Sequence, residues 1–224
     1  GLLDVHVHLR EPGAAHKEDF LSGSRAALAG GFTYILDMPN NPFPTISLER
    51  LEEKISLSKQ KSVCDIGFYY GTDGNNIGSF AAVAQNPYVF GLKIYCNHTT
   101  GTLLIEDKDK LNTIFNAWNF NKPILVHAER DQLEFALFLA KKFKRKLHVC
   151  HISLASEVEM VKEAKWKKTQ VSTGVTPHHL FLTQKDVEKL KNLAIMKPPL
   201  GTQADQDALW DGLLDGTIDL VESD

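Results

Sequence analysis

The sequence predicts an α/β fold of the TIM-like (β/α)8 barrel type. Short apolar stretches rich in β-branched residues alternate with longer amphipathic stretches. The alternation occurs about eight times at a spacing of roughly 28 residues, which suits one strand and one helix per repeat. An open, doubly wound sheet is the alternative, but no Gly-x-Gly-x-x-Gly motif follows a predicted strand. The count of about eight repeats therefore favours the barrel.

The predicted strands are the short apolar runs, and several of them end in a polar or charged residue. Runs of this length and composition, bounded by turn-forming residues, are typical of β-strands. They cover Leu3–His8, Thr33–Asp37, Cys64–Tyr70, Val89–Tyr95, Pro123–His127, Leu147–His151, Gln170–Val175 and Thr217–Val221.

The predicted helices are the amphipathic stretches between these strands. Ser47 can cap a helix N-terminus, and Glu49 then lies in the first turn, where a negative charge suits the helix dipole. Gly30 and Gly31 end the first helix, because glycine adopts a left-handed backbone at low cost there. The predicted helices are Lys17–Ala29, Ser47–Lys59, Gly78–Gln85, Asp107–Asn119, Asp131–Lys144, Ala155–Lys168, Gln184–Leu190 and Ala204–Leu214.

Composition describes an ordinary globular chain and argues against two classes of function. Of the 224 residues, 43% are hydrophobic and 24% are charged, and the formal net charge is −3. Because there is no basic excess, we do not expect nucleic-acid binding. No apolar run approaches the ~20 residues that cross a bilayer, so we expect no membrane partner. The three cysteines are too few for a disulfide framework and favour a cytoplasmic protein.

We expect a single domain over residues 1–224, because no linker, low-complexity block or charge run marks a boundary. Residues 2–5 already resemble a strand, and so does the segment from Ile218 to Val221. The sequence therefore resembles the core of a barrel whose flanking segments are absent.

Ionisable and metal-binding side chains gather at the carboxyl ends of the predicted strands. In a barrel these ends meet at one rim, where catalytic groups lie. The first strand ends at His6–His8, the fourth carries Lys93, and the fifth ends at His127. The sixth ends at His151, and Asp224 follows the eighth. The sequence thus predicts one site to which all these residues contribute.

His6 and His8 are the most informative pair in this set. Residues two apart on a strand point to the same side, so both imidazoles can bind one ion. Such a pair alone is more often part of a polar core, but histidines at two further strand ends favour a metal, and neutral imidazole suits zinc. His148 lies three residues before His151, so we expect it to point to the opposite, outward side of its strand.

Two interpretations are open for Lys93, which has apolar neighbours on both sides. Its ammonium group is costly to bury, so the side chain can extend to solvent or pair with an acid. Alternatively, its pKa falls and the neutral amine reacts with carbon dioxide, which gives a carbamate able to bridge two metal ions. Sequence periodicity does not choose between these interpretations.

Asp224 follows the apolar run of the last predicted strand. A carboxylate at this strand end can bind a metal and accept a proton from metal-bound water, whose pKa is lowered towards ~7. Alternatively, Asp224 is an ordinary acidic residue on the protein surface, which its position in the sequence also allows.

The segment His6-Val7-His8-Leu9-Arg10-Glu11-Pro12-Gly13 resembles the opening motif of dihydroorotases, which are members of the amidohydrolase superfamily. Further segments resemble this family and follow in the family's order. They are Asp37-Met38-Pro39-Asn40, Gly91-Leu92-Lys93-Ile94-Tyr95, His127-Ala128-Glu129, Val149-Cys150-His151, Thr176-Pro177-His178-His179-Leu180 and Ser223-Asp224. The resemblance spans nearly the whole chain.

The resemblance implies a TIM-like barrel with a binuclear zinc centre. His6, His8 and Asp224 would hold the more buried ion, and His127 and His151 the other. Carboxylated Lys93 would bridge the two, so that each chain binds two Zn²⁺. The implied activity is that of a zinc-dependent dihydroorotase, which reversibly cyclises N-carbamoyl-L-aspartate to L-dihydroorotate in de novo pyrimidine biosynthesis. Asp224 would then be the catalytic residue that carries the proton.

The resemblance also implies substrate-binding residues. Arg10 and Asn40 match family residues that hold the substrate carboxylate, and an arginine fork pairs well with a carboxylate. Thr99 and Thr100 lie in a loop after the fourth predicted strand, and such loops can close over a ligand. Lys197 stands where relatives tend to have Asn or Arg against the pyrimidine ring.

Two departures from the family pattern keep other functions open. An acidic residue often precedes the Pro-His-His motif, and Gly174 in that position removes an auxiliary metal contact that would involve Cys150. Together with Lys197, this motivates a catalytically silent dihydroorotase-like barrel that acts as a scaffold for a partner such as aspartate transcarbamoylase. An allantoinase- or hydantoinase-like cyclic amidohydrolase is a further alternative, but its substrate would have no use for Arg10. We expect a small-molecule substrate and a homo-oligomer.

Overall fold

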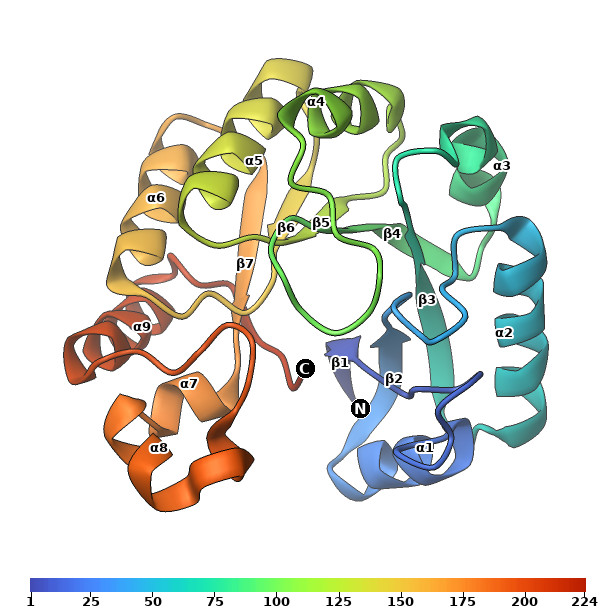
Figure 1. Cartoon of the computed structure of the whole chain (residues 1–224), viewed down its shortest axis with the longest axis horizontal. Coiled ribbons are helices and arrows are strands. Elements are labelled where there is room, and N and C mark those ends of the chain that lie inside the picture. Colours follow the sequence, from blue (N-terminus) through green and yellow to red (C-terminus); the bar gives the residue numbers. More distant parts are fainter.

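Eight parallel strands form one curled sheet in the order of the sequence, from β1 to β8 (Figure 1). The computed structural model describes residues 1–224. Helices alternate with the strands and cover the outer side of the sheet, as expected for a TIM-like fold. The strands are β1 (Leu2–Val7), β2 (Phe32–Asp37), β3 (Asp65–Gly71), β4 (Val89–Tyr95), β5 (Ile124–His127), β6 (Leu147–Val149), β7 (Val171–Val175) and β8 (Leu220–Val221).

The helices confirm the predicted alternation with the strands and most of the predicted helix starts and stops. The Ser47 hydroxyl accepts a hydrogen bond from the Arg50 N–H at 3.2 Å and so caps α2 as predicted. Gly31, with a φ of 85°, has the left-handed backbone after the first helix, whereas Gly30 stays right-handed. No helix combines the length and the apolar character that crossing a membrane requires. The helices are α1 (Phe20–Ala29), α2 (Leu48–Lys61), η1 (Ile77–Ser79), α3 (Phe80–Gln85), α4 (Lys108–Ala117), α5 (Arg130–Phe143), α6 (Ala155–Trp166), α7 (Pro177–Phe181), α8 (Gln184–Leu190), η2 (Lys191–Ala194) and α9 (Gln203–Asp215).

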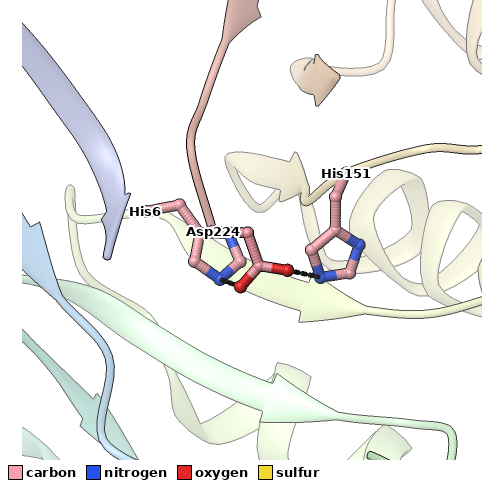
Figure 2. Close-up of side chains that lie close together, drawn as sticks. All are labelled: His6, His151 and Asp224. Carbon is pink, nitrogen blue, oxygen red and sulfur yellow. Dashed lines mark ion pairs between the residues drawn. The ribbon is translucent and has the colours of Figure 1, made fainter. Parts of the chain in front are cut away.

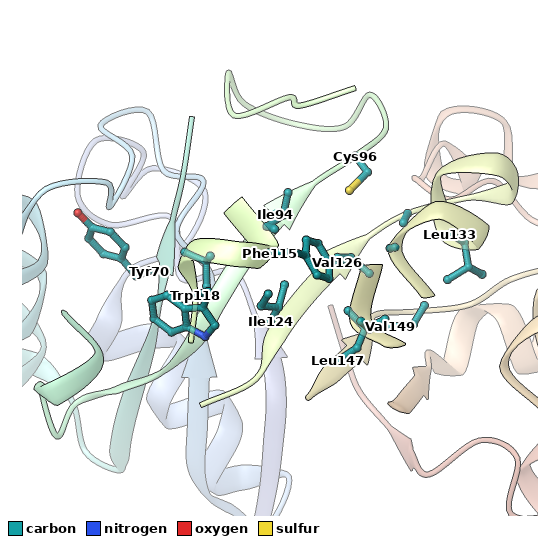
Figure 3. Close-up of a cluster of buried hydrophobic side chains, with 14 of the residues drawn as sticks. Tyr70, Ile94, Cys96, Phe115, Trp118, Ile124, Val126, Leu133, Leu147 and Val149 are labelled. Atoms are coloured by element: carbon teal, nitrogen blue, oxygen red, sulfur yellow. The ribbon is translucent and has the colours of Figure 1, made fainter. Parts of the chain in front are cut away.

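Side chains on the strands alternate between two packing layers. The larger layer lies between the sheet and the helices, where Phe115 and Trp118 pack in one cluster with Ile124 and Val126 (Figure 3). A much smaller apolar cluster is separate from it and consists of Leu36, Met38, Tyr69, Leu125 and Cys150. Because this second cluster is so small, polar side chains of the same strands, such as the fully buried Lys93, complete the interior of the curl.

The structure shortens two predicted strands and adds a short helix. β6 stops at Val149, and His151 then has a left-handed backbone with a φ of 32°, which is incompatible with an extended strand. β8 begins only at Leu220, because the Ile218 N–H still bonds to the Gly212 carbonyl of α9. The added helix, α7, is a single turn that starts at a proline, and its five residues are too few to show an amphipathic period.

The two edges of the sheet approach each other at the chain ends (Figure 1). The Asp224 backbone N–H donates a hydrogen bond to the His6 carbonyl at 2.9 Å. The Ser223 hydroxyl donates to the same carbonyl at 3.2 Å, and the Ser223 N–H donates to the Asp4 carboxylate at 3.3 Å. These contacts fix the segment after β8 against β1 and bring the Asp224 side chain to the first strand.

A buried ion pair holds the loop that follows β2. The Lys54 ammonium on α2 lies 2.8 Å from the Asp37 carboxylate and donates to the Met38 carbonyl at 2.6 Å and to the Asn41 side chain at 2.7 Å. The other Asp37 oxygen accepts the Leu9 N–H at 2.9 Å. Neither charged side chain is more than 1% exposed. The pair therefore joins the ends of β1 and β2 to α2.

We expect Lys54→Met to lower the free energy of unfolding by about 3–5 kcal/mol, because it leaves the Asp37 carboxylate buried without its partner. Urea unfolding measures this change. The double variant D37N/K54M should recover part of the loss, since it removes both charges. Arg50→Ala breaks an exposed ion pair on the same helix and should cost no more than ~1 kcal/mol. A K54M effect as small as that of R50A would contradict the assigned role.

Candidate metal centre

The predicted metal-binding side chains converge at the carboxyl ends of the strands. His6 lies on β1, and His8 directly follows that strand. His127 is the last residue of β5, His151 follows β6, and Asp224 follows β8. All four histidine rings are buried or nearly so, and the Asp224 side chain is 19% exposed. Five side chains from four separate segments of the sequence therefore share one interior region.

The first group consists of His6, His8 and Asp224. The Nε2 atoms of the two imidazoles are 3.3 Å apart. Asp224 Oδ1 lies 3.1 Å from His6 Nε2 and 2.9 Å from His8 Nε2. Two ligand atoms on a tetrahedral zinc ion with bonds near 2.0–2.1 Å are about 3.3 Å apart. The spacing and chemistry of this donor set therefore fit one zinc ion.

The second group consists of His127 and His151, and Asp224 links it to the first. His127 Nδ1 lies 3.1 Å from His151 Nε2, and the ring centroids are 4.7 Å apart. Asp224 Oδ2 lies 4.0 Å from His151 Nε2, while Oδ1 faces His6 (Figure 2). The carboxylate is thus directed at both groups. His6, His151 and Asp224 together offer three metal-binding atoms within 4.8 Å of one another.

Lys93 on β4 is fully buried, so the alternative in which its side chain extends to solvent does not occur. Its Nζ donates a hydrogen bond to Cys150 Sγ at 2.9 Å and lies 5.0 Å from the centroid of the Tyr95 ring. The ion pairs of the structure do not include this ammonium group. Lys93 therefore shares the interior with Cys150, but the geometry does not place its nitrogen against a histidine.

Electrostatics keep most of the histidines neutral. Burial lowers the pKa of His8 to about 4 and also lowers the pKa values of His127 and His151. The pKa of Asp224 lies far below its usual range: burial opposes this shift, but the neighbouring His6 dominates. Neutral imidazoles next to an ionised carboxylate are the protonation states that metal ligands require.

His6 is the exception among the imidazoles. Burial and the nearby Lys93 act to lower its pKa, but the carboxylates of Asp224 and Glu222 raise it well above the ordinary value. The two carboxylates thus favour the protonated form of His6, whereas burial favours the neutral form of the other three imidazoles.

Three residues of the site have a left-handed backbone although they are not glycine. They are Arg10, His151 and Asp224, with φ values of 55°, 32° and 60°. Such conformations are uncommon outside glycine and concentrate at functional sites. Each of them ends or follows a strand and turns its side chain away from the regular alternation. This local geometry accounts for part of the convergence.

The prediction that His148 points outward is wrong. Its side chain is buried, with Nδ1 3.0 Å from the Ser172 hydroxyl and Nε2 3.4 Å from Glu222 Oε2. Cys150, two residues on, lies on the same side of the strand and contacts Lys93. His151 reaches the interior as well because its positive φ breaks the alternation.

A cavity of about 480 Å³ adjoins the first group of ligands. His8 and Asp224 form one wall, and the predicted substrate-binding residues Arg10, Asn40, Thr99, Thr100 and Lys197 all line it. The structure thus brings these residues together, and their contact with a substrate stays a prediction. Sequence reasoning did not assign four further lining residues, which lie in helix α7 and in loops. They are His98, His178, Ile195 and Met196.

A long loop between β4 and α4 extends over the mouth of the curled sheet (Figure 1). The Asn40 amide donates a hydrogen bond to the Thr100 carbonyl at 2.9 Å, which ties the loop to the end of β2. The Asn97 side chain accepts the Glu129 N–H at 2.8 Å, which ties it to the end of β5. The loop is therefore held at two strand ends that border the site.

Sequence reasoning also missed Glu222, which is fully buried two residues before Asp224. Its carboxylate lies 3.4 Å from His6 Nδ1 and accepts the His151 N–H at 2.5 Å. With His6 and Cys150 it forms a second group of three possible metal-binding atoms. Glu222 and Asp224 both lie beyond β8, and Asp224 has a left-handed backbone, so strand alternation gave no signal for Glu222.

The fold and these side chains define a class: a TIM-like α/β protein with a candidate metal centre at the carboxyl ends of its strands. A family model described as dihydro-orotase-like matches residues 1–93. A dihydroorotase of Lactobacillus acidophilus is 36% identical over 257 residues, which cover 100% of this chain and 59% of the relative. The multifunctional protein CAD of Squalus acanthias is 39% identical over 216 residues, which cover 95% of this chain and 10% of that protein. The chain is thus similar to dihydroorotases over its whole length.

Solved structures support the fold. An L-hydantoinase (dihydropyrimidinase) of Arthrobacter aurescens superposes with a TM-score of 0.92 at 24% identity, over 100% of this chain and 57% of that protein. The inactive dihydroorotase-like domain of the Chaetomium thermophilum CAD-like multifunctional protein superposes with a TM-score of 0.83 at 26% identity, over 99% of this chain and 62% of that one. The chain thus spans only part of the length of these relatives.

His179 provides a pH test in a segment that borders the cavity. Its Nε2 lies 3.1 Å from the Pro198 carbonyl, which can only accept, so Nε2 carries a proton, and Nδ1 lies 2.6 Å from the Thr176 hydroxyl. A neutral ring protonated on Nε2 satisfies both contacts by accepting from that hydroxyl, and burial lowers its pKa to about 4. Because the unfolded ring titrates near 6.5, unfolding takes up a proton between these values, and stability falls as the pH falls.

We expect His179 to account for about 3 kcal/mol of the loss in unfolding free energy between pH 6.5 and pH 4. Urea unfolding of the wild type and of His179→Asn, in the presence of a chelator, measures this contribution. The variant should be less stable at pH 7 but should lose less stability on acidification. Equal losses in the two proteins would show that the ring is not held neutral.

Proposed function

We propose that this chain provides the catalytic barrel of a zinc-dependent dihydroorotase, which interconverts N-carbamoyl-L-aspartate and L-dihydroorotate in pyrimidine biosynthesis. The convergence of His6, His8, His127, His151 and Asp224 beside a cavity lined by Arg10 carries the proposal. The similarity to dihydroorotases supports it. The hydrogen bond from Asp224 to β1 supports closure of the curled sheet into a (β/α)8 barrel.

Two zinc ions, when bound, would polarise the ring amide carbonyl and lower the pKa of water, as Lewis acids do. His6, His8 and Asp224 would hold one ion, and His127 and His151 the other. Asp224 Oδ2, which faces away from His6, would accept the proton of the attacking water and return it to the ring nitrogen as the amide bond breaks. In the reverse direction the same carboxylate carries the proton the other way.

Lys93 is proposed to bridge the two ions as a carbamate. Its neutral amine would add to carbon dioxide, so that an N–C bond forms, one proton leaves and an anionic carboxylate results. Full burial and the lack of an ion pair support this modification, because an unmodified ammonium would be costly at this position.

The cavity lining supports a substrate that carries a carboxylate. The Arg10 guanidinium can bind a carboxylate through two parallel hydrogen bonds. Asn40 would share this anion, Lys197 would face the ring, and Thr99 and Thr100 would bind from the loop above. Hydantoin and allantoin lack the ring carboxylate, so Arg10 favours dihydroorotate over the substrate of a hydantoinase or an allantoinase.

A catalytically silent scaffold is the second candidate. The superposition on an inactive dihydroorotase-like domain favours it. The convergence of the four histidines and Asp224 argues against a silent scaffold, because such groups are costly to bury without a partner. The resemblance to CAD supports association with other pyrimidine-pathway enzymes, and we propose aspartate transcarbamoylase as a partner and a homo-oligomer in the cytoplasm.

We expect the purified full-length protein to contain about two zinc ions per chain, as a two-metal mechanism requires. Elemental analysis measures the content, and turnover of carbamoyl aspartate before and after chelation measures its role. Activity should disappear with the metal and return with added zinc. A zinc-supplied protein with no bound metal and no turnover would favour the scaffold.

We expect Arg10→Ala to lower kcat/KM for dihydroorotate by about 10- to 100-fold, mainly through KM, because one charged hydrogen-bonding partner of the carboxylate is lost. Initial rates on dihydroorotate and on hydantoin measure the specificity. Any rate on hydantoin should change little. If both substrates suffered equally, Arg10 would have a structural role rather than a role in substrate selection.

A further inference from the structure

Glu222 lies between β1, which carries His6, and the segment after β6, which carries His151. It follows β8 directly, and its carboxylate is 0% exposed. One oxygen, Oε1, accepts the backbone N–H of His151 at 2.5 Å. The other, Oε2, lies 3.4 Å from His6 Nδ1 and 3.4 Å from His148 Nε2. A single buried carboxylate therefore contacts one member of each ligand group.

The carboxylate crosses the intervening strand above Gly174 of β7. A Cβ atom on Gly174 would lie 2.4 Å from Glu222 Oε1 and 2.5 Å from its Cδ, closer than real Cβ contacts allow. The Gly174 carbonyl meanwhile accepts the Ile152 N–H at 3.0 Å, so β7 remains bonded to the segment after β6. Glycine at 174 thus provides the space that the Glu222 carboxylate fills.

The contact with His6 has a chemical consequence. The Nε2 atom of His6 faces His8 and Asp224, and its Nδ1 faces Glu222. A carboxylate on the Nδ1 side favours a proton on that nitrogen, which leaves the Nε2 lone pair free for a metal. Carboxylate partners of this kind fix the orientation and tautomer of metal-binding imidazoles.

The contact with His151 has a structural consequence. The backbone of His151 is left-handed, a conformation that surrounding contacts must hold in place. The hydrogen bond from its N–H to an ionised carboxylate is of the strong, charge-assisted kind. The same carboxylate thus holds the backbone turn that directs the His151 ring towards His127.

We propose that Glu222 is a positioning residue of the metal centre, which orients His6 and His151 together. The absence of a side chain at Gly174 leaves the space that the Glu222 carboxylate occupies. This inference rests on the proposed zinc centre. Glu222 itself does not touch the substrate cavity, whose lining comes from other residues. Its loss should therefore weaken zinc binding and kcat rather than KM.

The first experiment replaces Glu222 by Gln in the full-length protein, which preserves the shape and removes the charge. Competition with a chromogenic chelator measures zinc affinity in the metal-stripped protein, independently of activity. We expect zinc affinity to fall about 10- to 100-fold, with an unchanged number of ions at saturation and an unchanged KM. Glu157→Gln is the matched control, because Glu157 is an equally buried carboxylate that accepts backbone N–H groups at the start of α6 without contacting a histidine.

The second experiment moves the carboxylate to the neighbouring strand. Glu222→Ala should bind zinc weakly, and Gly174→Glu alone should be destabilised by the clash. The double variant G174E/E222A removes the clash and supplies a carboxylate from β7, so it should recover much of the zinc affinity lost in E222A. Thermal unfolding of each variant shows whether it is folded.

The outcomes separate this inference from the function on which it rests. A wild type that binds no zinc overturns the metal centre and the role of Glu222 together. A wild type that binds zinc, with E222Q equal to it and to E157Q, overturns the role of Glu222 alone. Loss of one bound ion at saturation in E222Q would also overturn it, because Glu222 would then be a ligand with His6 and Cys150. If G174E/E222A bound zinc no more tightly than E222A, a carboxylate from β7 would not replace that of Glu222. The proposed role of Gly174 would then be overturned.

Discussion

The contact between the segment after β8 and the first strand is the interaction on which the site depends. The Asp224 N–H and the Ser223 hydroxyl both donate hydrogen bonds to the His6 carbonyl. Ser223 and His6 are 217 positions apart in the sequence. Without this contact, the Asp224 carboxylate would not face His6 and His8. The contact is local in space and distant in sequence, so the first ligand group forms only when both ends of the curled sheet are in place.

The division of the interior explains how a hydrophobic fold can tolerate so many polar groups. The outer layer between sheet and helices supplies most of the apolar burial, with residues such as Phe115 and Trp118. The inner apolar cluster is small. Polar side chains inside the curl therefore contact one another instead of displacing a large apolar core, and hydrogen bonds and ion pairs offset the cost of their burial.

The alternation of the fold and the convergence of the candidate ligands could be predicted from the sequence because their signals are local. The alternation of strands and helices gave the architecture, and the strand ends gave His6, His8, His127, His151 and Asp224. His148 and Glu222 could not be placed in this way. The orientation of His148 was judged from the spacing to His151, and a left-handed backbone at His151 invalidates that spacing. The role of Glu222 depends on Gly174, which belongs to another strand.

The tie between Asn40 and the loop after β4 makes ligand binding and loop position reciprocal. The Asn40 amide has two protons, and the Thr100 carbonyl uses one of them. A ligand that takes the second proton holds the amide plane in the orientation that the loop also needs. Thermodynamic linkage then requires that a docked loop raises the affinity for the ligand by the same factor as the ligand favours the docked loop. A ligand bound to Asn40 would thus be coupled to the loop through this one side chain.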